Sequence, residues 1–186
     1  MKEASEEEKN LAIEKGDVTD GTPFITVIVD GGWSHRSHGH RYTTNSGVSC
    51  VIGMRTQTIL DLGIRNKSCS ICEYREAQQL HPKHDKCYKN WDGASASMEK
   101  DMLVECFKHS KQLHGLEYHS VVGDGDSSVF YYLKTSVTYG RSIQKVECAN
   151  HVVKNYTKRL YALQIESTTA TKKVSNEIIR RLKAAA

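Results

Sequence analysis

A run of six residues from Phe24 to Val29, Phe-Ile-Thr-Val-Ile-Val, constrains the fold more than any other segment. The run is apolar at nearly every position and rich in β-branched side chains, which is typical of a strand buried inside a sheet. It ends at Asp30-Gly31-Gly32, and glycines let the backbone come close to a ligand. The sequence therefore predicts a central strand with a carboxylate at its exit.

Further elements are expected on both sides of this strand. A Glu/Lys-rich helix is predicted over residues 2–14, and a polar loop over 34–47 separates the central strand from two more strands. These strands, at 48–54 and 58–64, are joined by a short turn, so three consecutive antiparallel strands are expected. After a Cys/His-rich insert, helices and short strands are predicted at 98–114, 118–122, 127–134, 143–146, 151–164 and 175–183. The order predicts an α/β fold with a mixed sheet and flanking helices.

Charge is unevenly spread along the 186 residues, although the net charge is only +4. Residues 1–20 carry seven acids and three bases, whereas residues 141–186 carry ten bases and three acids. We predict an acidic N-terminal helix and linker over 1–20, a main domain over 21–165 and a basic C-terminal helix over 166–186. The basic end suits a polyanion such as DNA, although a solvated helix face explains the same charges.

The N-terminus and the apolar content bear on location. No apolar stretch approaches the roughly 20 residues that cross a bilayer, and Met1 to Glu8 lack the apolar core of a secretory signal. We expect a nuclear or other intracellular protein that is not secreted and does not contact membranes, with its cysteines reduced. The sequence leaves the oligomeric state open, a homo-oligomer included.

A second carboxylate shares the setting of the first. Asp124 follows the strand predicted at 118–122 and precedes a glycine, as Asp30 does. Two strand-end carboxylates brought together in one sheet repel each other unless a cation lies between them. Mg²⁺ or Mn²⁺ suits that place, since hard divalent ions take carboxylate oxygens and phosphate together. The alternative for each residue alone is an ordinary turn aspartate.

The insert at 66–97 carries a pattern of metal-binding side chains. Cys69 and Cys72 are spaced as Cys-x-x-Cys, and His81, His84 and Cys87 follow. Thiolates and imidazoles at this spacing can close a tetrahedral zinc site, which would give a loop-rich insert its core. The preferred ligands are Cys69, Cys72, His84 and Cys87, with His81 as the substitute histidine. Reduced cysteines beside a stray histidine are the alternative.

The other cysteines are less telling. Cys50 and Cys106 lie inside apolar patterns and are expected to be buried and inert. Cys148 and His151 stand at the start of a predicted helix and are a candidate metal-binding pair. A buried cysteine beside a capping Asn150 explains the same residues.

These pieces, in this order, resemble the Mutator-like transposase domain over roughly residues 20–165. The resemblance lies in the segments Val29–Trp33, Gly53–Thr56, Arg65–Cys72, His84–Cys87, Lys89–Trp91, Ser97–Glu99, Gly123–Ser128 and Glu147–His151. It implies a ribonuclease-H-like fold, in which three acids bind divalent metal for DNA strand cleavage and joining. Asp30 matches the first acid, Asp124 the second, and Cys148-x-x-His151 matches a signature that follows the second.

The third acid has no match, because only Glu166 and Glu177 follow His151 and neither is clearly placed on a helix returning to the sheet. We therefore expect the domain to be truncated in residues 166–186. Two functions remain open: an incomplete DNA-cleaving transposase domain, or a non-catalytic, zinc-containing remnant of a mobile element that binds nucleic acid or protein. A phosphohydrolase using Asp124 and Asp126 is less consistent, since its nucleophile strand would come first in the chain.

Overall fold

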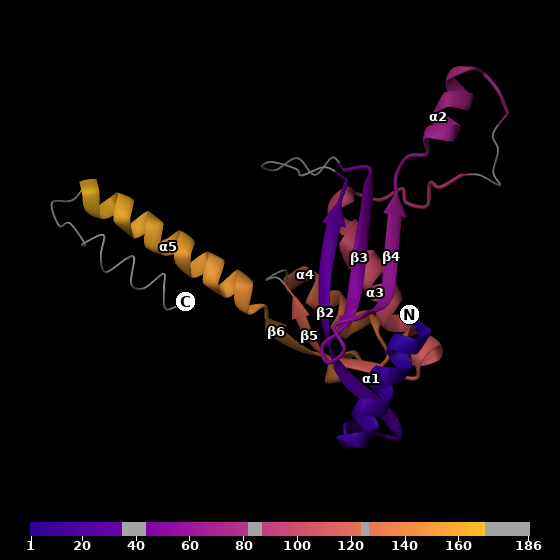
Figure 1. Ribbon diagram of the computed structural model, residues 1–186. Coiled ribbons are helices and arrows are strands. Elements are labelled where there is room, and N and C mark those ends of the chain that lie inside the picture. Colours follow the sequence, from indigo (N-terminus) through magenta and orange to yellow (C-terminus); the bar gives the residue numbers. More distant parts are fainter. Residues whose placement is uncertain (35–43, 82–86, 124–126, 170–186) are drawn as a thin grey trace. The chain divides into compact units, whose positions relative to one another are not determined.

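The computed structural model describes residues 1–34, 44–81, 87–123 and 127–169, with only the backbone described at Ser127, His151 and 164–169. Among these residues the fold is mixed α/β, as predicted, with a six-stranded sheet and helices (Figure 1). The chain divides into two compact units, residues 1–146 and residues 147–186. Within the described part of the chain, no helix combines the length and the apolar character needed to cross a membrane.

The sheet has the strand order β4-β3-β2-β5-β6, with the short β1 paired to β2 off this path. Pairing is antiparallel between β2 and β3 and between β3 and β4, whereas β2 and β5 are parallel. The prediction of three consecutive antiparallel strands is therefore confirmed by β2, β3 and β4. The strand predicted from Phe24 to Val29 is part of β2 and is central, as expected. The strands are β1 (Val18–Thr19), β2 (Thr22–Trp33), β3 (Ser46–Gly53), β4 (Ile59–Asn66), β5 (Glu117–Gly123) and β6 (Gln144–Glu147).

Five α-helices accompany these strands in the described residues. Two of them, α1 (Lys2–Glu14) and α3 (Met98–His114), have the predicted bounds, and α3 ends at Gly115, whose φ of +63° only glycine adopts readily. A helix inside the insert was not predicted. The remaining helices are α2 (Ser70–Ala77), α4 (Ser127–Ser136) and α5 (Ala149–Thr169), and short 3-10 turns lie at Ser95–Ser97 and Gly140–Ser142.

One face of the sheet is covered and holds the core. Alternate residues of β2 to β4 point towards α3 and α1, and α4 packs beside α3. Figure 1 shows α3 behind β2 to β4. The core side chains are completely or almost completely buried and include Ile25, Val27, Val51, Leu60, Leu103, Phe107, Tyr118 and Leu133.

The opposite face carries the other set of alternating side chains, which are half-buried or exposed. On β4 it includes Ile59, Leu62 and Ile64, each more than 40% exposed. Cys50 of β3 lies on this face and is half-buried, so the prediction that it is buried was wrong, whereas Cys106 is buried as expected. A period-two pattern identifies two faces but not which of them receives helices.

Candidate metal sites

Asp30 lies in β2, three residues before the end of the strand. The strand was predicted to end before this residue, but β2 continues to Trp33 because it pairs with β3, with Asp30 opposite Cys50. The carboxylate is exposed on the open face of the sheet, where Oδ1 accepts a hydrogen bond of 2.9 Å from the amide of Gly31. Burial, and then the charge of Asp30, raise the pKa of the neighbouring Cys50 thiol.

The parallel pairing of β2 with β5 stops just short of Asp30. Its last register pair joins Ile28 to Val122. Asp30 comes two residues after Ile28 in the sequence, and Asp124 comes two residues after Val122. The structure describes β5 up to Gly123, so Asp124 lies outside the described residues.

Glu99 is a carboxylate near the same edge to which sequence reasoning gave no role. It is the second residue of α3, and a Cβ placed on Gly31 would lie only 3.1 Å from its Cδ and Oε1 atoms. It also lines a small cavity of about 20 Å³ together with Val29, Gly123 and Lys145. Because Gly31 and Asp30 are successive residues of one strand, Glu99 approaches the face opposite to that of Asp30. The sequence signal that could have identified Glu99 is its position as an acid in the first turn of a helix that packs against a strand end.

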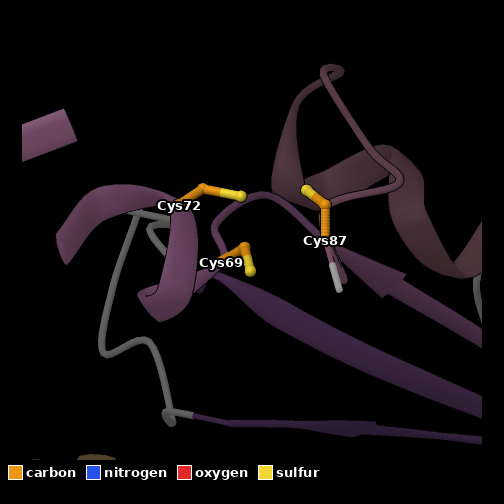
Figure 2. Close-up of side chains that lie close together, drawn as sticks. All are labelled: Cys69, Cys72 and Cys87. Atoms are coloured by element: carbon orange, nitrogen blue, oxygen red, sulfur yellow. The ribbon is translucent and has the colours of Figure 1, made fainter. Parts of the chain in front are cut away.

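The strongest cluster of metal-ligating atoms in the described residues is formed by three cysteines of the insert. The sulfur atoms of Cys69, Cys72 and Cys87 all lie within 4.8 Å of one another. Figure 2 shows Cys69 and Cys72 at the start of α2 and Cys87 on the returning chain. Sulfurs bound to one zinc ion at about 2.3 Å each are separated by a little less than this. The cluster can therefore hold a soft metal ion such as zinc with little rearrangement.

The two ends of the insert are tied together next to this cluster. The backbone N–H of Asn66 donates to Oδ1 of Asn90 at 2.7 Å, and the Asn66 carbonyl accepts from the amides of Asn90 and Trp91 at 3.0 Å each. The Asn90 side chain also donates to the carbonyl of Ile64 at 3.0 Å. This Asn66–Asn90 clamp explains how cysteines at positions 69 and 87 come together.

The thiols of the cluster differ in their acidity. Hydrogen bonds from the backbone at Tyr88 and then at Cys72 lower the pKa of Cys69 to about 7. Hydrogen bonding to Cys87, then burial and the nearby Cys69, raise the pKa of Cys72 to about 12. The raised pKa of Cys72 would not prevent metal binding, because a thiol that coordinates a metal ion is deprotonated outright. Three sulfur atoms this close together are therefore better explained as ligands of one metal ion than as three neutral thiols.

Among the described residues, no other predicted ligand is part of this cluster. His84 lies outside them. His81 is exposed, and its carbonyl accepts a hydrogen bond from Arg75. Cys148 is half-buried at the start of the second unit, and the side chain of His151 is not described. The pairing of Cys148 with His151 stays a prediction.

Comparison with known proteins identifies a family. A profile of the Mutator-like transposase family matches residues 1–186, the whole chain. The chain belongs to this family. No curated protein and no solved structure matches it. Membership confirms the resemblance inferred from the sequence and extends it beyond residues 20–165 to both ends of this Mutator-like transposase chain.

Proposed function

We propose that this Mutator-like transposase chain is a transposase-derived domain that holds Mg²⁺ or Mn²⁺ between Asp30 and Asp124 for cleavage and transfer of DNA strands. The observation that carries the proposal is the Ile28–Val122 register pair of the parallel strands β2 and β5, because Asp30 and Asp124 each follow this pair by two residues in the sequence. The strand order, with an antiparallel start and a parallel fourth main strand, is consistent with a ribonuclease-H-like fold.

The chemistry expected of this pair follows from general properties of divalent ions. Such an ion polarises a phosphodiester and lowers the pKa of a bound water, so that an attacking oxygen is available at neutral pH. The role of Asp30 and Asp124 is to supply the anionic oxygens that hold and orient the ion. Asp30 is suited to this because its carboxylate is exposed and hydrogen-bonded only through one oxygen within the described residues.

Nicking of supercoiled DNA in Mn²⁺ tests the enzyme. Loss of a metal ligand should remove several kcal/mol of transition-state stabilisation, so Asp30→Asn and Asp124→Asn should each lower the rate roughly a thousandfold. The matched control is Asp92→Asn, since Asp92 is an exposed aspartate that forms a salt bridge with Lys89. Nicking that is absent, or that both Asn variants retain, would contradict a catalytic role.

The alternative function is a non-catalytic, zinc-containing module that binds nucleic acid or protein, and the three-cysteine cluster favours it. We propose zinc bound by Cys69, Cys72 and Cys87, with His84 as the fourth ligand. Metal analysis should give about one zinc ion per chain, falling on Cys69→Ser and on His84→Ala. Cys106→Ser is the control, because Cys106 is a buried thiol outside the cluster. Zinc retained in Cys69→Ser would overturn this assignment, and zinc lost in His81→Ala but not His84→Ala would reassign the fourth ligand.

The chain is expected to act on or with DNA inside the cell, in the nucleus where the host has one. The family and the basic end support this partner. Association into homo-oligomers is a further expectation, which light scattering of the purified chain would test.

A further inference from the structure

Two adjacent tyrosines on the outer side of α4 form an aromatic surface. Val129 and Leu133 of this helix are buried in the core, whereas Tyr131 is 63% exposed and Tyr132 is 41% exposed. The centroids of the two tyrosine rings lie 5.6 Å apart and their planes are at 86°, which is an edge-to-face contact. Single exposed aromatic residues are ordinary on protein surfaces. Two rings that contact each other in this way offer a preformed face for a flat ligand.

A lysine from the neighbouring helix completes this Tyr131–Tyr132 surface. Nζ of Lys100 lies 3.9 Å from the centroid of the Tyr132 ring, which is a cation–π contact. The acids on either side of Lys100 in the sequence have other neighbours. Asp101 accepts a hydrogen bond of 2.7 Å from Arg65, and Glu99 lies against Gly31. Tyr132 therefore holds the ammonium group of Lys100 near the exposed ring of Tyr131.

The surface lies at the end of the sheet where Asp30 is found. Lys100 is the third residue of α3 and directly follows Glu99, whose carboxylate approaches Gly31, the residue after Asp30. Tyr131 lies in the first half of α4, about 6 Å along the helix axis from its first residue. Because α3 and α4 cover the face of the sheet opposite to that of Asp30, the surface is placed for DNA that flanks the cleaved phosphate.

The charge of this part of the chain favours a polyanion over a second copy of the chain. Residues 127–146 contain Lys134, Arg141 and Lys145 and no acid. Within the described part of the chain, no carboxylate forms a salt bridge with Lys100 or with Lys134. Two copies that met through this surface would bring like charges together, whereas a phosphate backbone would neutralise them.

We propose that Tyr131 stacks on an unpaired base of DNA while Lys100, held by Tyr132, contacts the phosphate backbone beside that base. The identity of the nucleic acid rests on the proposed function, but the surface shares no residue with the proposed metal sites. Stacking on tyrosine is tolerant of sequence, since every base has a π-face. The surface would keep the DNA next to the cleaved phosphate single-stranded.

Binding of single-stranded oligonucleotides to the full chain tests the stacking, with no Mg²⁺ or Mn²⁺ added so that cleavage does not intervene. Fluorescence anisotropy compares oligodeoxythymidine with an abasic oligonucleotide of equal length. The wild type should prefer the base-bearing strand roughly tenfold. Tyr131→Ala should abolish this preference and leave abasic binding unchanged, whereas Tyr131→Phe keeps a ring and should retain the preference. Tyr74→Ala is the matched control, because Tyr74 is a tyrosine of α2 that is 66% exposed.

The phosphate contact is tested by Lys100→Met. This change should weaken binding of both oligonucleotides alike and reduce the slope of log affinity against log salt by about 0.7, the contribution of one phosphate of a single strand. Lys108→Met removes an exposed lysine from the same helix and should leave the slope unchanged. Equal slopes for wild type and Lys100→Met would remove Lys100 from the proposal.

Several outcomes would overturn the stacking. They are equal affinity of the wild type for both oligonucleotides, a base preference that survives Tyr131→Ala, and a wild-type dimer that Tyr131→Ala dissociates while the preference stays. If Tyr131→Ala unfolds by circular dichroism, Tyr131→Gln removes the ring with a smaller loss of volume and gives the same test. Nicking that depends on Asp30, without any base preference, would sink this proposal alone. A base preference that Tyr131→Ala abolishes, without metal-dependent nicking, would instead remove the proposed enzymatic function.

Discussion

Glu8 shows how one buried carboxylate fixes a helix and a turn at once. Its side chain is fully buried, and Oε1 accepts hydrogen bonds from the backbone amides of Arg55 and Thr56 at 3.0 and 2.8 Å and from the Thr56 hydroxyl at 3.0 Å. Through these bonds α1 holds the turn between β3 and β4. A buried amide without an acceptor costs about 1–3 kcal/mol, so this residue stabilises the fold rather than any reaction.

Replacing Glu8 therefore has a specific cost. Glu8→Ala leaves two backbone amides without their acceptor and should lower the free energy of unfolding in urea by about 3 kcal/mol. Glu8→Gln keeps Oε1 as an acceptor and should lose less. Glu7→Ala alters an exposed neighbour on the same helix and should stay within about 0.5 kcal/mol of wild type. A Glu8→Ala variant as stable as Glu7→Ala would show that the turn does not depend on this carboxylate.

Glu117 gives the unfolding free energy a predictable pH dependence. Burial favours its neutral form, but hydrogen bonds from Lys111 at 2.9 Å and His119 at 2.9 Å outweigh burial and lower the pKa of the carboxyl from its ordinary value of 4.5. A carboxyl with a lowered pKa in the folded state stabilises the fold above its unfolded pKa. That contribution disappears as the pH falls through the lowered value.

Lys111→Met tests this pair. The Lys111 side chain is 55% exposed, so solvent screening limits the loss at pH 7 to about 1 kcal/mol or less. The difference from wild type should shrink in urea titrations as the pH is lowered below 4.5. Lys108→Met, on the exposed side of the same helix, should show no such pH-dependent difference. A gap between wild type and Lys111→Met that persists unchanged in acid would exclude the ion pair as its cause.

At the scale of elements, the Asn66–Asn90 clamp positions the ends of the insert for the cysteine cluster. Asn90→Ala removes the acceptor of the Asn66 amide and the donor to Ile64. Groups that orient metal ligands typically contribute 10–100-fold to affinity, and we expect zinc affinity to fall by about this factor. Competition with a chromophoric chelator measures the loss. Glu76→Ala, an exposed change on α2, should leave affinity unchanged, and equal affinities in both variants would count against the clamp.

The elements also show which parts of the fold local sequence determines. The bounds of α1 and α3 follow from helical periodicity and from Gly115, which are properties of neighbouring residues. The extension of β2 past Asp30 depends on its pairing with β3, and the Asn66–Asn90 clamp joins residues 24 positions apart. The helix α2 was missed because its segment is polar and shows no apolar stripe. The Cys-x-x-Cys spacing predicted Cys69 and Cys72, and Cys87 was predicted from its place later in the same insert, since ligand spacing is itself local.

At the scale of the whole molecule, the charges are segregated along the chain. The second compact unit includes α5, on which Lys154, Lys158 and Arg159 are exposed. Lys154 and Lys158 are four residues apart and lie on one side of the helix. The first compact unit begins with α1, whose neighbourhood is acidic. A phosphate backbone would be attracted to the former and repelled by the latter, and salt weakens both effects.

The effect of this charge segregation on DNA binding can be tested through the salt dependence of the affinity. Changing Lys154, Lys158 and Arg159 together to alanine should weaken duplex binding and reduce the slope of log affinity against log salt by about 2–3, since each neutralised phosphate contributes about 0.9. The control removes the same number of charges from the acidic end, at Lys2, Lys9 and Lys15, and should change the slope by less than one phosphate contact, about 0.9. If the slopes of the two triple variants fall equally, net charge alone governs binding. If neither slope falls, DNA is bound elsewhere and α5 is a solvated helix.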